Sequence, residues 1–260
     1  MFSRFTRALV RPPAHTFAQG LTTVSLGAPD VDGALAQHAA YCDALERHGC
    51  RVMPLPADDR YPDSTFVEDT ALIVPGRGAL LARPGAASRD GEVEVIAVAL
   101  RSAFSELPRI VEPGTLDAGD VCDAGDHLFI GLSERTNVAG AAQLSTWAAQ
   151  FGMTSSTVDI REVDGILHLK SGIAAIEPTR LVLIEALAEH PAFRGYEVVR
   201  VPAGEEYGAN CVRVNDVILV SDGQPRLNAQ LRALGYALEV LDMSEYRKMD
   251  GGLSCLSLRW

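Results

Sequence analysis

The segment VDGALAQHAAYCDALERHGCRVMPLP, residues 31–56, is the stretch that decides the fold of this chain. Its apolar residues recur at the spacing of an amphipathic helix from Val31 to Leu45. Gly49 follows, and glycine commonly ends a helix because it adopts positive φ without steric cost. The next residues, RVMPLP, are typical of a β-strand. The segment therefore predicts a helix that leads directly into a strand.

The same order of helix and strand recurs along the chain. Helical apolar spacing is found again in four segments, at residues 93–104, 144–151, 183–193 and 227–234. Each is followed by a strand-like run, in turn RIVEP, TVDI, YEVVRVP and YALEVLDM. Four of the five predicted helices end at a glycine, namely Gly49, Gly152, Gly195 and Gly235. A further short strand is expected beside each polar turn, in TALIVP, HLFIGL, SGIAAIE, NCVRVNDVILV and LSCLSL.

Five such units indicate a cyclic α/β arrangement within one domain, residues 1–260. The alternative is an ordinary α/β sheet whose helices happen to be of similar length. No Pro/Ser-rich linker divides the sequence. No G-x-G-x-x-G motif follows a predicted strand, so nothing supports a dinucleotide-binding fold.

The composition is that of an ordinary globular protein with an acidic balance. Of the 260 residues, 47% are hydrophobic and 22% are charged, which suffices for a sizeable core. The formal net charge of -11 argues against nucleic acid as a partner, because phosphate binding needs a basic face. An acidic balance is compatible with a cationic substrate, although more often it only aids solubility.

The five cysteines form no close C-x-x-C pair. An odd number without paired spacing favours a reducing, intracellular setting over a disulfide framework. The first residues, MFSRFTRALVRPP, contain no apolar run of secretory length. No segment approaches the roughly 18 apolar residues of a membrane helix. We therefore expect a cytoplasmic protein without a membrane partner.

Five polar residues are spaced almost evenly: Asp69, Asp117, His168, Asn210 and Cys255, at intervals of 48, 51, 42 and 45 residues. Each lies in a Gly- or Asp-rich turn beside an apolar strand-like run. A repeat architecture brings equivalent positions to one axis. The spacing therefore predicts that two acids, an imidazole and a thiol meet at one mouth, where thiol chemistry on a cationic substrate could take place.

Cys255 and His168 are the candidate nucleophile and general acid–base residue. A lone cysteine is usually a small core residue, but Gly251 and Gly252 ahead of Cys255 allow close backbone approach. His168 lies between a strand and a turn of small residues. A lone histidine is more often structural, yet histidine is the side chain whose ordinary pKa suits proton transfer near neutral pH.

Acidic residues cluster at the entry to the predicted strand TALIVP. Asp63, Glu68 and Asp69 surround Phe66 in the segment YPDSTFVEDT. The alternative is a solvated acidic loop, which is the commoner case. Carboxylates held at the edge of a core could bind a guanidinium group in bidentate fashion.

A second acidic turn, LDAGD, contains Asp117 and Asp120. One of these carboxylates could orient His168, as the third member of a nucleophile, base and orienter set does. Metal binding is the rival use of such acids. The sequence contains no H-E-x-x-H, no C-x-x-C and no regular acidic calcium loop, so we expect no metal and no cofactor.

Five motifs, STFVEDTALI, LDAGDV, IGLSERTN, LHLKSG and DGGLSC, together resemble the dimethylarginine dimethylaminohydrolases of the guanidino-modifying (pentein) superfamily. They occur in the order of that family and span nearly the whole chain. The resemblance implies a five-fold pseudosymmetric α/β propeller, with five ββαβ modules around a central channel.

The resemblance also implies the roles of individual residues. Cys255 would be the nucleophile, His168 the general acid and base, and Asp117 the carboxylate that orients His168. The other implied site residues bind substrate: Glu68 and Asp69 hold the guanidinium group, with Phe66 beside them, Asp63 takes the α-amino group, Arg89 and Arg135 take the α-carboxylate, Leu21 belongs to a lid, and Met249 and Asp250 make backbone contacts. Some relatives have Glu in place of Asp117, and some have a smaller branched residue in place of Met249.

The implied reaction is hydrolysis of Nω-methylated L-arginine to citrulline and methylamine or dimethylamine through a covalent thiouronium on Cys255. Two enzymatic alternatives stay open, a deiminase and an amidinotransferase acting on arginine or agmatine. A third alternative is a non-catalytic binding protein of the ribosome anti-association type, which shares the fold. The expected partner is a small molecule, and a homodimer is one oligomeric state left open.

Overall fold

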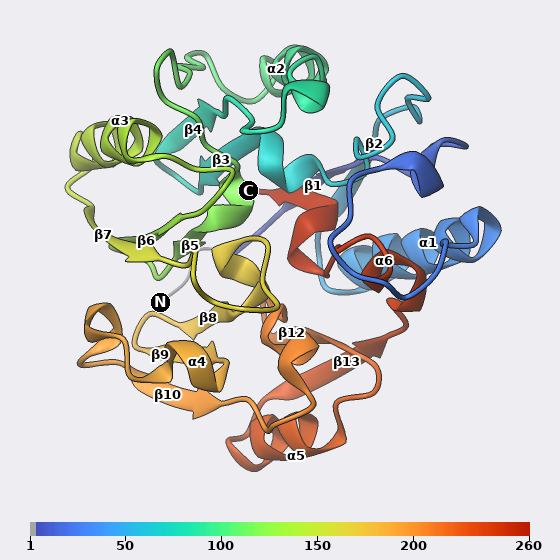
Figure 1. The fold of residues 1–260 in the computed structure, drawn as a ribbon, viewed down its shortest axis with the longest axis vertical. Helices are drawn as coiled ribbons and strands as arrows, with labels where there is room; N and C mark the ends of the chain where they lie inside the picture. The colour runs from blue at the N-terminus through green and yellow to red at the C-terminus, as the bar shows by residue number, and fades with distance from the viewer. Residues whose placement is uncertain (1–3) are drawn as a thin grey trace.

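The predicted units correspond to five small β-sheets in a computed structural model, which describes residues 4–260 (Figure 1). Three sheets follow one another in the middle of the chain: β3 Ala71–Val74 with β4 Gly78–Leu81; β5 Val121–Asp123, β6 His127–Leu132 and β7 Thr154–Asp159; β8 Ile173–Glu177, β9 Arg180–Leu183 and β10 Glu197–Arg200. The other two comprise β11 Val212–Val214, β12 Val217–Ser221 and β13 Ala237–Leu241, and then β14 Ser257–Arg259, β1 Arg7–Val10 and β2 Arg51–Pro54. The α/β class predicted from the sequence is confirmed.

The three-stranded sheets share one pattern. A first strand pairs antiparallel with a second, and the second pairs parallel with a third, as in β5, β6 and β7. Parallel neighbours need a crossover, and a helix supplies it. The helices are α1 Val31–Arg47, α2 Glu92–Leu100, α3 Val138–Ala149, α4 Glu185–Ala188, α5 Pro225–Ala233 and α6 Ser244–Arg247.

The glycines that the sequence predicts at helix ends can be compared with the helices of the structure. Four glycines directly after helical segments adopt positive φ: Gly49 at 91°, Gly152 at 74°, Gly195 at 94° and Gly235 at 92°. A side chain at these positions would be strained, because L-residues rarely adopt such angles. The predicted helix ends are therefore confirmed at Gly49, Gly152 and Gly235. The prediction of one helix over residues 183–193 is wrong, because α4 ends at Ala188 and Pro191 begins a separate 3-10 turn before Gly195.

Three strand predictions need correction. RIVEP forms only an isolated parallel bridge between Arg109 and Leu81, so the sheet of β3 and β4 has two strands. HLFIGL is the second strand of its sheet, while the strand directly after LDAGD is β5. NCVRVNDVILV contains two strands, β11 and β12, joined by a turn in which Asn215 takes a φ of 56°. Short apolar runs do not reveal where such a turn interrupts them.

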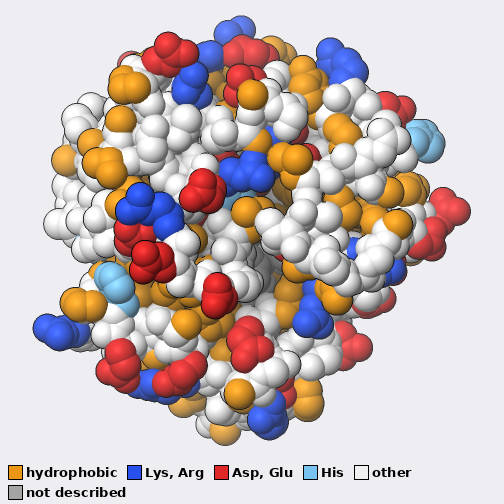
Figure 2. Space-filling view, viewed as in Figure 1, with side chains coloured by type: hydrophobic (Ala, Val, Ile, Leu, Met, Phe, Trp, Pro, Cys, Tyr) orange, Lys and Arg blue, Asp and Glu red, His pale blue; other side chains and the backbone are white. Residues whose placement is uncertain are grey.

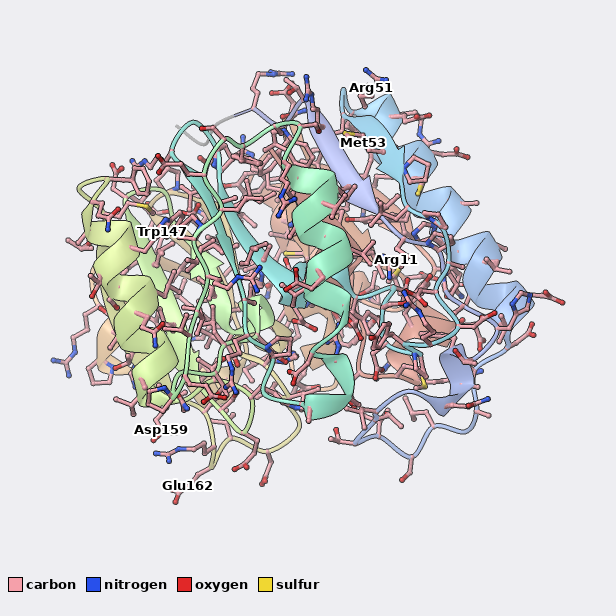
Figure 3. The ribbon with its side chains drawn as sticks, turned by 90° about the horizontal axis from the view of Figure 1, so that it is seen from above. Arg11, Arg51, Met53, Trp147, Asp159 and Glu162 are labelled. Carbon is pink, nitrogen blue, oxygen red and sulfur yellow. The ribbon has the colours of Figure 1, made fainter. Side chains whose placement is uncertain are left out.

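The helices lie on the perimeter and bury one face against the sheets. Figure 3 looks onto α2, with α3 and α1 on either side of it. Leu144 and Trp147 of α3 share a buried cluster with Leu128 and Ile130 of β6. Burial of such side chains contributes roughly 1.5–3 kcal/mol each, so this face holds the helix in place.

A short 3-10 turn precedes the first strand of every sheet. These five inner turns are Val67–Thr70, Ala118–Asp120, Leu169–Ser171, Glu206–Ala209 and Ser254–Leu256, and they lead into β3, β5, β8, β11 and β14. Side chains link one turn to the next through backbone N–H groups. Gly119 donates to Asp69 at 3.0 Å, Leu169 to Asp120 at 2.9 Å and Ser254 to Asn210 at 2.9 Å.

A cavity of about 470 Å³ lies beside the inner turns. Residues from β3, β5, β8, β11 and β14 all contribute to its lining, together with Glu68, Lys170, Ser254 and Arg259. On the face shown in Figure 2, acidic and basic side chains are interspersed without a broad basic area. No helix within residues 4–260 is both long and apolar enough to span a bilayer.

Candidate active site

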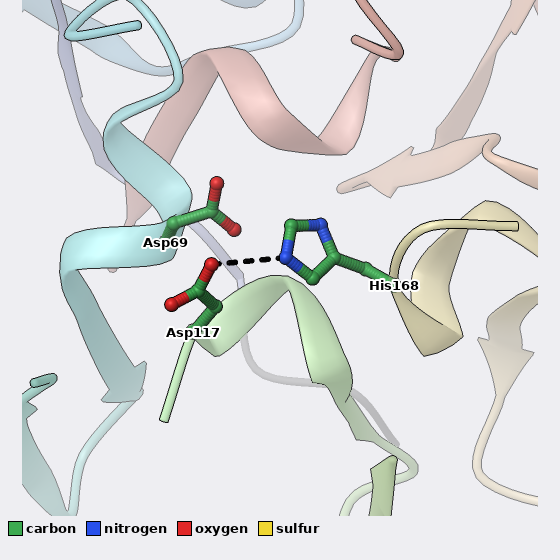
Figure 4. A group of neighbouring side chains, drawn as sticks. All are labelled: Asp69, Asp117 and His168. Atoms are coloured by element: carbon green, nitrogen blue, oxygen red, sulfur yellow. Dashed lines mark hydrogen bonds and ion pairs between the residues drawn. The ribbon is translucent and has the colours of Figure 1, made fainter. Parts of the chain in front are cut away.

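Asp69, Asp117 and His168 converge from three separate segments (Figure 4). One ligand atom of each lies within 4.8 Å of the others, and all three side chains are buried. Asp117 and His168 occupy equivalent places, each in an extended conformation directly before an inner turn. The repeat of the backbone therefore delivers a carboxylate and an imidazole to the same point.

Asp117 holds the imidazole of His168. Its Oδ2 lies 3.0 Å from Nε2 of His168, and its Oδ1 accepts the backbone N–H of Gly85 at 2.9 Å. The second contact fixes the carboxylate, because both oxygens then have partners in a buried setting. This arrangement matches the orienting role expected for Asp117, a role that stays a prediction.

The imidazole of His168 is a strong base in this setting. Burial disfavours its protonated form, but the carboxylates of Asp69, Asp117 and Asp120 outweigh that effect and raise its pKa to about 9 from the ordinary 6.5. His168 is therefore protonated at neutral pH in the free protein. A proton is available there for a leaving group.

The charge of Asp69 acts on both His168 and the candidate thiol of Cys255. Its Oδ1 accepts from Gly119, and its Oδ2 accepts from Arg89 at 2.6 Å. Burial opposes ionisation, but His168 and Arg89 outweigh it and lower the pKa of Asp69. The group is therefore an anion at neutral pH and can attract a cation.

Cys255 is half-buried in the inner turn Ser254–Leu256, directly ahead of β14. Burial first, and then the nearby carboxylates of Glu68 and Asp69, raise the pKa of its thiol to about 12. The chain passes close to its neighbours here: a Cβ on Gly251 would lie 2.4 Å from the Phe66 ring, and one on Gly252 would lie 2.5 Å from the Asn210 side chain. The glycine pair thus permits the close backbone approach predicted from the sequence.

Glu68 and Asp69 are adjacent but have different partners. Glu68 Oε1 lies 2.6 Å from Nζ of Lys170, and its Oε2 accepts from Ser254 Oγ at 2.8 Å. Glu68 lines the cavity beside the turns, whereas Asp69 meets His168. Both oxygens of each carboxylate have partners, so hydrogen bonding does not separate the two; Asp69 is the one that lies with Asp117 and His168.

Arg89 is buried and paired with two carboxylates. It donates to Asp69 and, through Nε and NH2, to Glu92, while the carbonyls of Asp63 and Phe66 accept further N–H groups. The bidentate contact anchors Arg89 on Glu92, and its NH1 then holds Asp69 through a single charge-assisted hydrogen bond. Binding of a substrate carboxylate by Arg89 would use what remains of its donors and stays a prediction.

Arg135 is the freer of the two arginines. Its guanidinium makes no ion pair among residues 4–260, and its charge acts on Asp63, whose pKa is raised chiefly by burial. A cationic group without a partner beside an acid fits recognition of an amino acid. The structure thus favours Arg135 over Arg89 as the contact for an α-carboxylate.

Four other predicted residues lie around this centre. Phe66 is buried against the rings of Phe17 and Tyr246. Leu21 is 42% exposed, and its N–H donates to both oxygens of Asp63. Met249 is buried, and its Cε lies 3.2 Å from a Cβ position on Gly20. Asp250 has a φ of 56° and accepts hydrogen bonds from residues 22 and 23.

The three converging side chains also form a set that could in principle ligate a metal. Their lone pairs are committed elsewhere: Asp69 accepts from Gly119 and Arg89, and Asp117 from Gly85. A protonated His168 has no lone pair to offer. These residues therefore fit a hydrogen-bonded acid–base group better than a metal site, and the absence of a metal stays a prediction.

Sequence reasoning overlooked several residues of this site. Lys170, Ser254 and Arg259 contact Glu68, and Tyr207 donates to the carbonyl of Gly251 at 2.8 Å. Lys170 and Ser254 lie inside LHLKSG and DGGLSC, so their motif positions were a usable signal. Arg259 and Tyr207 lie outside these motifs, so nothing in the sequence indicated that they belong to the site.

Comparison with known proteins supports an enzymatic site. No family model matches the sequence. The N(G),N(G)-dimethylarginine dimethylaminohydrolase of Pseudomonas aeruginosa is 41% identical over 257 residues, covering 98% of this chain and all of that protein. The enzyme of the same name from Streptomyces coelicolor is 36% identical, covering 97% of this chain and 96% of that protein.

Solved structures agree with these relatives. A cysteine-to-serine variant of the P. aeruginosa protein in complex with citrulline superposes with a TM-score of 0.95 at 40% identity, over 99% of this chain and 100% of that chain. The N-terminal domain of ArgZ, a cyanobacterial arginine dihydrolase, superposes with a TM-score of 0.87 at 18% identity, over 99% and 97%, and shows the fold alone. Because this chain is 41% and 36% identical to two named enzymes over nearly its full length, it belongs to the N(G),N(G)-dimethylarginine dimethylaminohydrolase family.

Proposed function

We propose that the protein hydrolyses Nω-methylated L-arginines to L-citrulline and dimethylamine or methylamine. The observation that carries the proposal is the convergence of the buried acids Asp69 and Asp117 on a protonated His168, with the thiol of Cys255 near enough for the charge of Asp69 to act on it. Full-length identity to named dimethylarginine dimethylaminohydrolases supports the same reaction.

Binding places a planar cation among fixed anions. Asp69 is held by Gly119 and Arg89, so its carboxylate has little freedom and presents a fixed charge to the guanidinium. Asp63 is proposed to take the α-amino group and Arg135 the α-carboxylate. The bound cation favours ionisation of Cys255, because positive charge beside a thiol lowers its pKa.

Covalent chemistry follows in two steps. The Cys255 sulfur forms a bond to the guanidinium carbon, and the thiol proton passes to solvent, because the imidazole of His168 already carries its proton. His168 donates its proton to the methylated nitrogen, and the C–N bond breaks to release neutral amine. General-acid assistance of this kind is worth on the order of 10² to 10⁴ in rate.

The remaining thiouronium on Cys255 is then hydrolysed. His168, now neutral, accepts a proton from water as the oxygen bonds to the same carbon. The C–S bond breaks, the thiol is restored and citrulline is released. Across both steps one water is consumed, and no electrons are transferred to or from the substrate.

Substitutions at the two reacting residues test the proposal. Cys255→Ser is expected to abolish citrulline formation while its thermal unfolding stays cooperative. His168→Ala is expected to retain alkylation of Cys255 by iodoacetamide but to lose turnover. Undiminished citrulline production by folded Cys255→Ser would refute the mechanism.

Measurement of the released amine separates the alternatives. A methylarginine hydrolase releases dimethylamine, whereas a deiminase acting on arginine or agmatine releases ammonia. An amidinotransferase forms a new guanidine when an amine acceptor is supplied. A binding protein forms no citrulline at all.

We propose in addition that the five sheets are modules of one five-fold pseudosymmetric propeller, and that residues 1–260 form a single catalytic domain. The shared strand pattern, the five inner turns and the cavity lined by one strand of each sheet support this.

The free cysteines within residues 4–260 fit the proposed cytoplasmic location. Sedimentation of the purified protein would test the homodimer, and titration with duplex DNA would test the expected lack of nucleic-acid binding.

A further inference from the structure

Residues 20–23, here called the lid segment, lie between two carboxylates from distant parts of the chain. The N–H of Leu21 donates to both oxygens of Asp63, at 3.0 and 3.2 Å. Asp250 accepts the backbone N–H and the hydroxyl of Thr23, and also the hydroxyl of Thr22 at 3.2 Å. Leu21 stays 42% exposed, so polar contacts rather than apolar burial hold the segment in place.

We infer that Asp250 is a positioning residue that latches the lid segment onto the loop that carries the nucleophile. Asp63 alone is unsuited to this task, because in the proposed function its carboxylate is also required by the α-amino group of the substrate. Asp250 is expected to meet substrate only through its backbone, so its carboxylate has no such competing duty. Its three donors from residues 22 and 23 set how much of the time the lid is closed before substrate binds.

The loop that contains Asp250 is held in place by its own contacts. The carbonyl of Lys248 is a second acceptor for the single hydroxyl hydrogen of Thr22, at 3.0 Å, and shares it with Asp250. Gly251 is held by the Tyr207 hydroxyl and leaves no room for a side chain beside Phe66. The lid segment is therefore hydrogen-bonded to a loop that is itself held in place by Tyr207 and by close contact with Phe66.

The backbone of Asp250 indicates that its position is imposed by its surroundings. Its φ of 56° is uncommon for any residue but glycine, although Asp and Asn tolerate it best. A residue persists in such a conformation when neighbouring contacts over-determine it. The contacts recorded for the Asp250 side chain go to Thr22 and Thr23 of the lid segment.

Limited proteolysis measures lid opening without any reaction. Leu21 and Leu26 are 42% and 51% exposed, and chymotrypsin cleaves after leucine once the backbone can leave its fixed conformation. Asp250→Asn keeps the tolerance for positive φ but removes the charge. Loss of charge-assisted hydrogen bonds predicts cleavage on the order of tenfold faster. Asp32→Asn, which removes an exposed acid from the start of α1, serves as the matched control and is expected to leave the rate unchanged.

A double-mutant cycle tests whether Thr23 is the residue of the lid segment that Asp250 holds. Thr23→Val removes a hydroxyl donor and is expected to accelerate cleavage in the wild-type background but not in Asp250→Asn. Thr23→Ser restores the hydroxyl and should restore the slow rate. Thr23 is exposed, so these variants remain informative even if Asp250→Asn does not fold.

Kinetics connect the latch with turnover, and this part rests on the proposed function. Asp250→Asn is expected to raise KM for dimethylarginine several-fold more than it lowers kcat, because the closed lid then has to be formed with substrate binding energy. An unchanged cleavage rate in Asp250→Asn and Thr23→Val would overturn the latch. Wild-type protein that forms no citrulline while the cleavage rates respond as expected would instead overturn the proposed function.

Discussion

The side-chain oxygen of Asn210 accepts the backbone N–H of Ser254 at 2.9 Å, across 44 residues of sequence. The amide nitrogen of Asn210 also donates to the Lys170 carbonyl at 3.0 Å. One buried amide thus ties the turn that follows His168 to the turn that contains Cys255. Asn210 therefore helps to fix the relative position of imidazole and sulfur, together with Glu68, which contacts Lys170 and Ser254 in the same two turns.

Asn210→Ala is expected to lower kcat by about 10- to 100-fold and to reduce the free energy of unfolding by about 2 kcal/mol, because two buried backbone groups lose their partner. Asn137→Ala is the control, since Asn137 bonds three backbone groups, against two for Asn210, and caps α3. Its loss of stability should be similar, with kcat unchanged. Steady-state citrulline assays and urea unfolding measure both effects, and equal losses of kcat in the two variants would contradict the role given to Asn210.

The raised pKa of His168 predicts that stability falls as the pH rises. A group whose pKa is higher in the folded protein stabilises it below the ordinary value of 6.5, and that contribution is lost as the pH passes about 9. Urea unfolding of Cys255→Ser should therefore lose about 2–3 kcal/mol between pH 6.5 and 9.5. The Ser background removes the thiol, whose raised pKa acts in the same direction. Cys255→Ser combined with His168→Asn should show a much flatter dependence, and an equally steep one would contradict the assignment.

The Cys255 thiol should react slowly in the free protein. Its pKa of about 12, raised by burial and by Glu68 and Asp69, predicts that alkylation by iodoacetamide keeps rising with pH beyond 9 without a plateau. A small guanidinium cation that leaves the thiol accessible should accelerate alkylation at pH 7. Mass spectrometry of the labelled cysteine measures the rate. A plateau near pH 7 without ligand would show that the thiolate forms unaided.

Arg89→Lys should be poorly tolerated. A lysine cannot reproduce the fork that bonds Asp69 and Glu92 at once, and it would leave part of a buried carboxylate pair without partners. Breaking a buried pair costs about 3–5 kcal/mol, so thermal unfolding should move sharply downward. Arg109→Lys, which alters an exposed pair with Glu94, should leave the melting temperature nearly unchanged.

Gly251→Ala should displace the loop that leads into Cys255. The new Cβ would lie 2.4 Å from Cε1 of Phe66, closer than side-chain atoms approach. A loss of stability of about 1–3 kcal/mol and of most activity is expected. Phe66→Leu in the same chain should recover part of the stability, because it removes the clashing ring atom. Without any such recovery, another contact, such as the Tyr246 carbonyl, would limit the space.

The sequence predicts the order of elements well where periodicity is strong. The helix from Val31 and its glycine stop at Gly49 agree with α1, which ends at Arg47. Strands of three or four residues, such as β4 and β9, are too short for their alternation to stand out. Their pairing depends on contacts with neighbouring strands, which a local pattern does not contain.

The candidate site was predicted in its chemistry but not in its fine geometry. Even spacing brought Asp69, Asp117 and His168 together, although by hydrogen bonding the counterpart of Asp69 is Asp120, three residues after Asp117. That Glu68 has Lys170 and Ser254 as partners, while adjacent Asp69 meets His168, follows from the tight 3-10 turn they share. A spacing argument fixes which turns meet; side-chain direction within a turn needs coordinates.

The sheet formed by β14, β1 and β2 has a consequence for how the protein acquires its chemistry. Residues 257–259 pair with residues 8–10, so strands from opposite ends of the polypeptide must find each other before this sheet exists. Cys255 stands just ahead of β14. The pairing of residues 8–10 with residues 257–259 therefore anchors the turn that carries the sulfur, and a substitution that weakens this pairing is expected to disturb the position of the thiol.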